Sequence, residues 1–375
     1  MQSAGNEPIR LAVITTSRSD FGSLEPVWRG ARADCRFAAH LLICGQHLAA
    51  QTLPAEELGG APAMRLPAAP EAIDGIAQRA LVEALRARRI EVVFVGGDRY
   101  ELLSVAECCT FAGAAIAHCS GGERTFGAFD DQLRDAVTKM AHLHFVAHRE
   151  AAERVISMQE EPWRVTVSGD PGLDPIAHAP RLSPEELEPL LGVRPAKNDV
   201  VVALHPVTRS AEETEVLVRA LVRFCQDFAG RIFLSTPNGD PGSEAIQQAW
   251  QSLAEQSPHC RLFPSLGAKV FRGLVAACGA LVGNSSAGVW ESPSLGTPSL
   301  DCGTRQSGRI RSTTVWSCGV DQAGALAAKV QHLLSPEVQA ACRQTVNPYG
   351  DGNAVPRILD AIAKSARDTR LRIKL

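Results

Sequence analysis

Short apolar runs rich in β-branched residues alternate with longer amphipathic stretches along most of this sequence. Such alternation is typical of α/β folds, in which crossover helices join the strands of a parallel sheet. The predicted helices are 73–88, 99–112, 213–228, 243–256 and 354–364. The predicted strands are 10–16, 36–44, 91–97, 114–120, 143–147, 164–169, 199–206, 231–237, 260–265, 279–284 and 297–303.

A segment rich in proline and acidic residues, DPGLDPIAHAPRLSPEELEPLLGVRPAKND, separates two such α/β halves. It is typical of a linker with one short helix, SPEELEPLL, for which Ser183 is the expected N-cap. The basic end RDTRLRIKL is expected to be a solvated last turn. The predicted division is an N-terminal Rossmann-like domain over 1–172, a linker over 173–197, a C-terminal Rossmann-like domain over 198–353 and a C-terminal helix over 354–375.

The composition is that of an ordinary globular enzyme, with 45% hydrophobic and 21% charged residues. A net charge of −3 provides no overall field for binding nucleic acid or an anionic membrane. The 11 cysteines are odd in number and form no C-x-x-C pair, which disfavours a disulfide framework or a zinc site. No signal-peptide pattern is present, and no run reaches the roughly 18 apolar residues of a membrane span. The expected location is the cytoplasm.

Nearly every predicted strand is followed by a cluster of small, polar or charged residues. Ligands of open parallel sheets bind outside the carboxyl ends of the strands, where these clusters would lie. One cluster alone would be ordinary turn chemistry, but their repetition favours a ligand cleft between two facing domains. The clusters are TTSRSD, GGDRYE, HCSGGE, HPVTRS, STPNGD, GNSSAG and CGTRQSGR.

The string GNSSAGVWE carries a candidate anion site. Asn284, Ser285 and Ser286 lie between a predicted strand and a helix expected to begin near Ala287, where backbone amides and hydroxyls suit a diphosphate. Glu291 would follow within two turns of helix and could accept hydrogen bonds from ribose hydroxyls. The alternative is a plain serine N-cap followed by a surface glutamate.

Arginines supply the second part of the candidate diphosphate site. Arg305 and Arg309 lie between glycines in CGTRQSGR, and a guanidinium can bind phosphate through two hydrogen bonds. Arg18 in TTSRSD is also placed to meet an anion, although this loop matches neither the G-x-G-x-x-G nor the Walker pattern. A solvated turn and a surface salt bridge are the alternatives. Next to the serine string, phosphate binding is the favoured interpretation.

Acid–base candidates come from the first half of the chain. Asp98 and Arg99 follow one predicted strand in GGDR, and Glu123, Asp130 and Asp131 follow the next. Carboxylates gathered beside a phosphate site can act as general acids and bases. The alternative for Asp130 and Asp131 is capping of the helix that follows them.

Histidines add one further candidate. His205, at the end of VVVALH, is an acid/base or sugar-hydroxyl candidate, with a structural role as the alternative. His142, His144 and His148 straddle a helix end and a strand, where successive side chains point apart. We therefore assign no metal site.

Taken together, these motifs resemble the hydrolysing UDP-N-acetylglucosamine 2-epimerase family, whose members open sialic and legionaminic acid pathways. The resemblance covers about 11–311 and implies a GT-B architecture, in which two Rossmann-like domains face each other across a cleft. It implies no cofactor and no metal. The motifs are TTSRSDFGSLEPV, GGDRYE, HCSGGERTFGAFDDQLRDAVTKMAHLHF, LHPVT, PNGDPGS, VGNSSAGVWES and LGTPSLDCGTRQSGR.

The resemblance also bears on individual residues, since Asp98, Asp130 and His205 match catalytic acid/base positions. Phe271 in KVFRGLV resembles the family's aromatic residue near the nucleotide base. With Glu123 added, the catalytic candidates are Asp98, Glu123, Asp130 and His205. The candidates for nucleotide or phosphate binding are Arg18, Arg99, Asn238, Phe271, Asn284, Ser285, Ser286, Glu291 and Arg305.

The chain departs from the family pattern in two places. Some members carry HIEGGE with a catalytic carboxylate as its third residue, whereas Ser120 stands there in this chain. Either Glu123 supplies the missing carboxylate, or this branch uses fewer carboxylates, or the sugar differs. The loop TSRSD also lacks the glycine that many relatives have before a threonine and an arginine.

The implied reaction converts UDP-N-acetylglucosamine to N-acetylmannosamine and UDP by anti elimination and then hydration. The same reaction on UDP-2,4-diacetamido-2,4,6-trideoxyglucose is the first alternative, which Ser120 keeps open. HPVT stands where non-hydrolysing epimerases carry a T-H-R string. A GT-B glycosyltransferase and an inactive sugar-nucleotide sensor are more distant alternatives. The expected partners are the UDP-sugar and copies of the chain in a homodimer or homotetramer, with no nucleic acid and no membrane.

Overall fold

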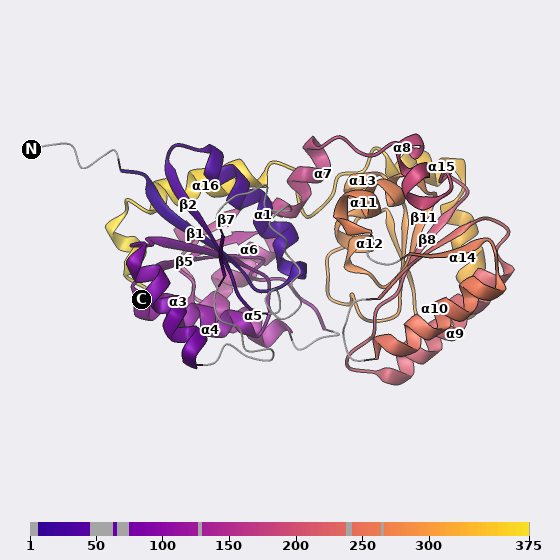
Figure 1. The fold of residues 1–375 in the computed structure, drawn as a ribbon, viewed down its shortest axis with the longest axis horizontal. Helices are drawn as coiled ribbons and strands as arrows, with labels where there is room; N and C mark the ends of the chain where they lie inside the picture. Colours follow the sequence, from indigo (N-terminus) through magenta and orange to yellow (C-terminus); the bar gives the residue numbers. More distant parts are fainter. Residues whose placement is uncertain are drawn as a thin grey trace, which may run out of the picture. The chain divides into compact units, whose positions relative to one another are not determined.

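A computed structural model describes residues 7–45, 63–65, 75–126, 130–237, 242–263 and 266–374. Contacts divide the chain into two compact units, and unit 1 includes the last helix, α16, which packs beside α1 (Figure 1). Unit 1 consists of Met1–Glu123, Asp130–Pro175 and Tyr349–Leu375, and unit 2 consists of Arg124–Phe129 and Ile176–Pro348.

Unit 1 contains a seven-stranded parallel sheet in the order β3-β2-β1-β4-β5-β6-β7. The central strands are buried apolar runs, as expected for a parallel sheet that is covered on both faces. The strands are β1 (Ile9–Thr15), β2 (Phe37–Ile43), β3 (Ala63–Arg65), β4 (Val92–Gly96), β5 (Ala115–Cys119), β6 (Leu143–Val146) and β7 (Val165–Val167).

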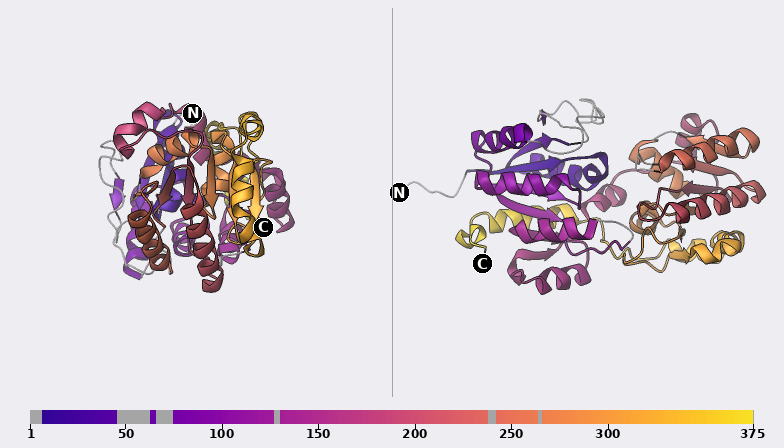
Figure 2. Two further views of the ribbon diagram at one scale, coloured as in Figure 1. Left: turned by 90° about the vertical axis from the view of Figure 1, so that its right-hand side faces the viewer. Right: turned by 90° about the horizontal axis from the view of Figure 1, so that it is seen from below.

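Helices cover both faces of this sheet (Figure 2). Apolar residues of α1 and α16 pack on one face, and those of α3, α4 and α5 pack on the other. The α-helices are α1 (Arg18–Ala33), α3 (Gly75–Ala87), α4 (Glu101–Ala112), α5 (Asp130–Met140), α6 (Arg149–Ser157) and α16 (Ala354–Ser365), and the 3-10 helices are η1 (Pro162–Arg164), η2 (Pro171–Leu173) and η4 (Thr369–Arg372).

Unit 2 repeats this architecture with a six-stranded parallel sheet in the order β10-β9-β8-β11-β12-β13. Apolar residues of α9, α10 and α14 cover one face of the sheet. The strands are β8 (Val200–Ala203), β9 (Ile232–Ser235), β10 (Cys260–Phe263), β11 (Ala280–Gly283), β12 (Ser299–Cys302) and β13 (Val315–Cys318).

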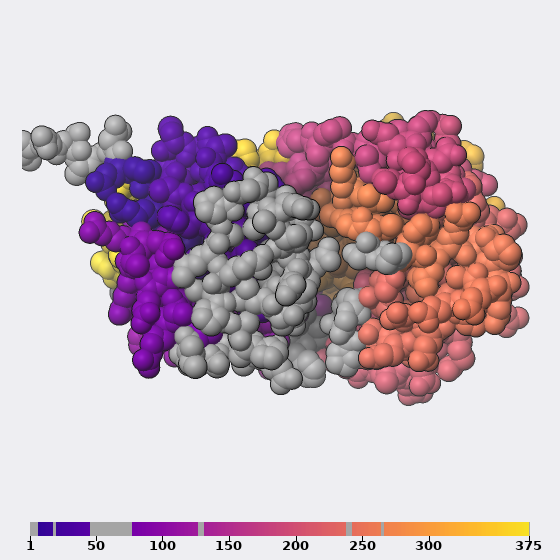
Figure 3. Space-filling view, viewed as in Figure 1, coloured from indigo at the N-terminus to yellow at the C-terminus, as the bar shows by residue number. Residues whose placement is uncertain are grey.

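The remaining helices of unit 2 include α11, which packs against α8 and α13. On the face drawn in Figure 3, the pink segment around α8 and the salmon-to-orange segments of α9 and α10 form much of the surface of this unit. The helices are α8 (Pro184–Leu191), α9 (Ala211–Asp227), α10 (Ser243–Gln256), α11 (Gly267–Ala277), α12 (Ser286–Trp290), α13 (Ser292–Leu295), η3 (Val320–Ala325), α14 (Leu326–Leu333) and α15 (Pro336–Cys342), with α7 (Asp174–His178) where the chain passes from unit 1 to unit 2.

These two sheets confirm the predicted α/β class with two Rossmann-like parts. Every predicted strand segment contains an observed strand, and Ser183 caps α8 as predicted by accepting a hydrogen bond from the N–H of Glu186. The predictions omitted the edge strands β3 and β13. In the ranges that the structure describes, no helix is both long enough and apolar enough to cross a membrane.

The predicted solvated last turn is confirmed for most of its described side chains but not for Leu371, since Arg367, Thr369, Arg370, Arg372 and Ile373 are exposed. Leu371 in η4 is only 3% exposed, because it completes the core between α1 and the sheet. The guanidinium of Arg164, itself buried, donates to the carbonyl oxygens of Leu371 at 3.2 Å, Arg370 at 3.1 Å and Ile373 at 2.6 Å. A buried guanidinium must find acceptors, and the backbone of this turn supplies them.

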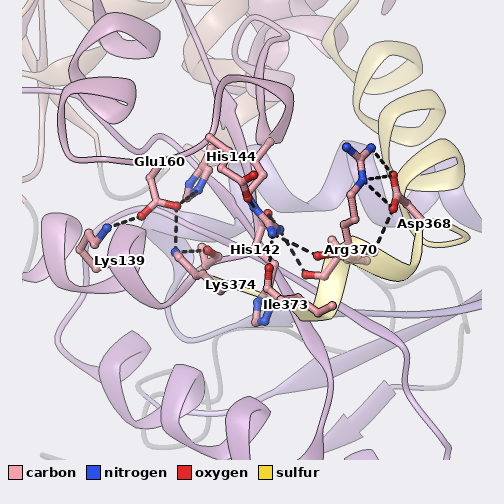
Figure 4. Close-up of polar contacts among 12 residues, drawn as sticks. Lys139, His142, His144, Glu160, Asp368, Arg370, Ile373 and Lys374 are labelled. Carbon is pink, nitrogen blue, oxygen red and sulfur yellow. Dashed lines mark hydrogen bonds and ion pairs between the residues drawn. The ribbon is translucent and has the colours of Figure 1, made fainter.

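Glu160 joins the same turn to β6 and α5. Its carboxylate accepts hydrogen bonds from Lys139 Nζ at 2.6 Å, His144 Nε2 at 3.1 Å and Lys374 Nζ at 2.9 Å (Figure 4). Burial alone would raise the pKa of Glu160, but these hydrogen bonds lower it to about 2. The ionised carboxylate therefore stabilises the folded state.

Glu160→Gln is expected to lower the free energy of unfolding at pH 7 by about 1–3 kcal/mol. Because the folded-state pKa lies below the ordinary value of 4.5, the stabilisation is complete above pH 4.5 and is lost as the pH falls toward 2. Urea unfolding of both proteins at pH 7 and pH 3 should therefore show a smaller gap at pH 3. Glu185→Gln, at an exposed pair with Arg194, serves as the control, and an equal gap at both pH values would contradict the prediction.

Candidate active site

Both sheets have a point where the strand order reverses, between β1 and β4 in unit 1 and between β8 and β11 in unit 2. In open α/β sheets, ligands bind outside the carboxyl ends of the strands at such points. Asp98 follows β4, His205 follows β8 and Asn284 follows β11. The structure thus places three predicted site residues at the expected positions, each within its own unit.

Asp20 shapes the loop that follows β1. Its Oδ2 accepts hydrogen bonds from the N–H of Thr16 at 2.9 Å, the hydroxyl of Thr16 at 2.6 Å and the N–H of Ser17 at 3.1 Å, and its Oδ1 accepts from the hydroxyl of Thr15. Burial raises the pKa of Asp20 to about 6, although the hydrogen bonds act in the opposite direction. This carboxylate fixes the backbone directly before Arg18, and the sequence analysis did not single it out.

Arg134 in α5 links the predicted acid–base residues. It is 1% exposed, and its Nη2 forms an ion pair with the carboxylate of Asp98. Its Nη1 donates to Asp131 Oδ1 at 2.6 Å and to the carbonyl oxygen of Glu123 at 2.8 Å. A buried guanidinium requires partners of this kind, so Arg134 holds the segments after β4 and β5 together.

His118 positions the backbone next to Asp98. Its Nε2 lies 2.9 Å from the carbonyl oxygen of Gly97, and its Nδ1 lies 3.2 Å from the hydroxyl of Thr138. Burial lowers the pKa of His118 to about 4, so the ring is neutral near pH 7 and donates from Nε2 to Gly97. Arg99 pairs with Glu101 at 3.3 Å and helps to fix the same loop.

Glu123 is a buried acid of unit 1, with 5% exposure. Its Oε1 lies 3.0 Å from Nε2 of His148. Burial lowers the pKa of His148, but the close contact with the carboxylate of Glu123 and the negative charge there outweigh this effect and raise the pKa above its ordinary value. Ser120 adopts a positive φ of 70°, and its N–H donates to the carbonyl oxygen of Phe145 at 3.0 Å. Glu123 is the one carboxylate among residues 120–126, and its role in place of a carboxylate at Ser120 stays a prediction.

Asn284 organises the candidate site of unit 2 and is completely buried. Its side-chain oxygen accepts from the N–H of His205 at 2.7 Å, and its Nδ2 donates to the carbonyl oxygen of His205 at 2.8 Å. The carbonyl oxygen of Asn284 accepts from Arg305 Nη1 at 3.1 Å and from Gln306 Nε2 at 2.8 Å. Three predicted residues, His205, Asn284 and Arg305, are thus brought together.

The serine string after β11 begins a helix, as predicted. Ser285 is the N-cap of α12 and accepts from the N–H of Ala287 at 3.4 Å, whereas Ser286 is exposed. Glu291 directly follows α12 and forms an ion pair with Arg272 Nε at 2.9 Å. The capping role of Ser285 leaves the exposed hydroxyl of Ser286 available to a ligand.

The other predicted residues have simpler positions. Arg18 begins α1 and Asp130 begins α5, and only their backbones are described. Because α5 begins at Asp130, both Asp130 and Asp131 belong to its first turn instead of capping it. Phe271 is half-buried in α11, and Asn238 lies outside the described residues.

The histidines near β6 serve as hydrogen-bonding groups. His142 Nδ1 accepts from the N–H of Ile116 at 3.1 Å, and His144 and His148 each face a glutamate. Among the described residues, no three His, Cys, Asp or Glu side chains gather in a way that could hold a metal ion.

Comparison with known proteins decides the family. A family model described as UDP-N-acetylglucosamine 2-epimerase matches residues 30–363. The chain belongs to the UDP-N-acetylglucosamine 2-epimerase family. The residues matched by this family model include the predicted catalytic and binding candidates of both units except Arg18.

Two relatives of this 2-epimerase family member illustrate its sequence similarity to bacterial enzymes. A GDP/UDP-N,N'-diacetylbacillosamine 2-epimerase (hydrolyzing) of Campylobacter jejuni is 32% identical over 242 residues, which cover 64% of this chain and 63% of that protein. The match therefore spans less than two thirds of the length of the Campylobacter protein. A UDP-N-acetylglucosamine 2-epimerase of Neisseria meningitidis is 30% identical over 321 residues, which cover 80% of this chain and 81% of that protein.

A solved structure has the same fold as this member of the 2-epimerase family. It is the UDP-GlcNAc 2-epimerase of Methanocaldococcus jannaschii in complex with UDP-GlcNAc and UDP, with a TM-score of 0.74 and 16% identity. The likeness covers 95% of this chain and 100% of that one, so it extends over both units. The GT-B-like fold implied by the sequence motifs is thereby confirmed.

Proposed function

We propose that this chain is a hydrolysing 2-epimerase that converts UDP-N-acetylglucosamine into N-acetylmannosamine and UDP. The observation that carries the proposal is that two acids, Asp98 and Glu123, follow β4 and β5, and that the buried guanidinium of Arg134 pairs with the carboxylate of Asp98 and donates to the backbone carbonyl of Glu123. Two carboxylates at neighbouring strand ends can supply both a base and an acid. Membership of the 2-epimerase family supports the sugar-nucleotide substrate.

The reaction needs acid–base groups because the hydrogen on carbon 2 of the sugar is not next to a carbonyl group. A base removes this proton while the bond between carbon 1 and the diphosphate oxygen breaks. UDP leaves with the bonding electron pair, and a 2-acetamidoglycal remains. Water then adds its hydroxyl to carbon 1, and an acid delivers a proton to the opposite face of carbon 2. Asp98, Glu123, Asp130 and His205 are the proposed groups for these proton transfers.

Unit 2 is the proposed nucleotide-binding part. The hydroxyl of Ser286 and the guanidinium of Arg305 would bind the diphosphate, because charge-assisted hydrogen bonds stabilise the leaving group. Arg305 contacts the backbone of Asn284, which also fixes His205. Glu291 would accept from the ribose hydroxyls. Arg18, Arg99, Asn238, Phe271 and Ser285 complete the proposed binding set.

A second substrate is favoured by one specific observation. Ser120 replaces the carboxylate of HIEGGE, and the Campylobacter relative is named for a diacetylated sugar. The alternative proposal is therefore the same elimination and hydration on UDP-2,4-diacetamido-2,4,6-trideoxyglucose. The two substrates differ at carbons 4 and 6 and share the reacting carbons 1 and 2.

Incubation with each UDP-sugar in deuterated water tests the proposal. Proton NMR should show UDP release and a free 2-epimeric sugar that carries deuterium at carbon 2. Faster turnover of the diacetamido sugar would select the alternative substrate. Epimerised UDP-sugar without UDP release would overturn hydrolysis, and UDP release only with an acceptor and without deuterium at carbon 2 would indicate a glycosyltransferase. UDP binding without turnover of either sugar would indicate a sensor.

A further inference from the structure

Glu123 is fixed at both its backbone and its side chain. Its carbonyl oxygen accepts from Arg134 Nη1 at 2.8 Å and from Arg154 Nη1 at 3.2 Å. One oxygen of its carboxylate, Oε1, lies 3.0 Å from His148 Nε2. The two guanidiniums therefore bind the main chain of Glu123. Among these contacts, only the imidazole of His148 lies next to the carboxylate.

The hydrogen bonds of His148 determine which ring nitrogen carries the proton. His148 is the N-cap of α6, and its Nδ1 accepts from the N–H of Ala151 at 3.2 Å. A nitrogen that accepts a hydrogen bond is unprotonated, so the proton of the neutral ring is on Nε2. Glu123 Oε1 lies 3.0 Å from this Nε2, within ion-pair distance, although the two atoms are not aligned as a hydrogen bond.

Backbone packing fixes the distance between the two residues. Gly122, directly before Glu123, has a φ of +78°, and a Cβ there would lie 2.3 Å from the carbonyl oxygen of Ala151. The loop after β5 thus contacts the first turn of α6, where the N–H of Ala151 donates to the imidazole of His148. β5 and β6 are neighbouring parallel strands, so their carboxyl ends, from which these segments begin, lie side by side.

We propose that His148 is a positioning residue for Glu123, and that the pair acts as a carboxylate–imidazole dyad in the proton transfers of the proposed function. His148 holds Oε1, so the second oxygen, Oε2, is the atom that exchanges a proton with the sugar or water. The dyad supplies an oriented carboxylate in a loop where Ser120 stands in place of the carboxylate that some family members carry. Orientation of an acid–base group by a neighbouring hydrogen bond is an established way to raise its efficiency.

The charges around the dyad determine its response to pH. The carboxylates of Glu123 and Glu150 favour the charged form of His148, whereas burial opposes it. Protonation of Nδ1 would also remove the hydrogen bond from Ala151, so charging the ring weakens the cap of α6.

Two substitutions of His148 separate its contacts. Asparagine is a good N-cap and can keep the hydrogen bond from Ala151, but it is too short to reach Glu123. Glutamine can place an N–H donor near Glu123 but gives up the cap. His148→Asn is expected to lower kcat about tenfold or more and to move the acidic limb of the kcat profile to higher pH, with a Tm close to that of the wild type. His148→Gln is expected to retain most of kcat and to have a lower Tm than the wild type.

A double-mutant cycle tests whether His148 acts through Glu123. Glu123→Gln should lower kcat further than His148→Asn, and the double variant should be no slower than Glu123→Gln alone. Full activity of Glu123→Gln, a wild-type pH profile of His148→Asn, or equal losses of kcat in both His148 variants would overturn the dyad. UDP release in deuterated water by the wild type, which tests the proposed function, is unaffected by any of these results.

A titration without substrate gives an independent readout on the full chain. In 15N NMR the neutral ring of His148 should carry its proton on Nε2, and its pKa should fall in Glu123→Gln. An Nδ1 proton, or an unchanged titration in Glu123→Gln, would overturn the dyad even if neither UDP-sugar were turned over. The dyad and the proposed function can therefore fail separately.

Discussion

Asp98→Asn is expected to lower kcat by about 10²–10⁴-fold, because asparagine cannot act as the general acid or base proposed for Asp98. Arg134 keeps two further acceptors, Asp131 Oδ1 at 2.6 Å and the carbonyl of Glu123 at 2.8 Å. The fold should therefore survive with a loss of about 1–3 kcal/mol. UDP release from the sugar nucleotide measures kcat, and calorimetric titration with UDP should give a nearly unchanged Kd.

Asp199→Asn is the matched control for this experiment. Asp199 is buried, whereas Asp98 is half-buried, and like Asp98 it pairs with an arginine, Arg231, at 2.8 Å. It directly precedes β8, at the amino end of the sheet in unit 2, so it is remote from the strand ends that carry the candidate site residues. We expect this control to lose stability while its kcat stays near the wild-type value. Equal kcat losses in both variants, or none in Asp98→Asn, would refute the catalytic role of Asp98.

Gly283→Ala is expected to destabilise unit 2 by about 2–6 kcal/mol, the sum of backbone strain and overpacking. Gly283 has a φ of +133°, and a Cβ there would lie 2.1 Å from the carbonyl oxygen of Ala203. These residues end β11 and β8, which are paired strands at the switch point. Separating the strands would also displace His205 and Asn284, so UDP binding should weaken in the same variant.

Gly267→Ala separates the two causes. Gly267 also has a positive φ, of +71°, but a Cβ there would meet no heavy atom of the described residues within 4 Å. It should therefore cost only the backbone strain, about 1–2 kcal/mol. Urea denaturation of both variants and calorimetric titration with UDP provide the comparison. If Gly283→Ala were no less stable than Gly267→Ala, the close approach of β8 and β11 would not be an energetic constraint.

The strands of both sheets could be predicted because parallel strands covered on both faces are continuous apolar runs. Val200–Ala203 and Ala280–Gly283 are buried at every position, and both were predicted. Val315–Cys318 was missed because it forms an edge strand with two partly exposed residues, so its sequence has no such run. The fold is thus predictable where burial is complete on both faces and less so at the sheet edges.

The candidate site was predictable where function follows from position at a strand end. Asp98, Glu123 and Asn284 were found in this way. Arg134 and His148 were not singled out as site residues, because their partners depend on tertiary packing: Arg134 meets Asp98 across 36 positions of sequence. The spacing of Asp131 and Arg134, three residues apart on one helix, could have indicated one contact but not the link to Asp98.

The return of α16 to unit 1 affects the order in which the chain can fold during synthesis. Ile358, Leu359 and Ile362 are buried in the same core as the residues of α1, so this core is incomplete until they are made. Unit 2 contains no residue beyond Pro348. On a ribosome, unit 2 can therefore complete its fold before unit 1, although most of unit 1 is synthesised first. Until α16 has been synthesised, the apolar residues of unit 1 that pack against this helix stay exposed.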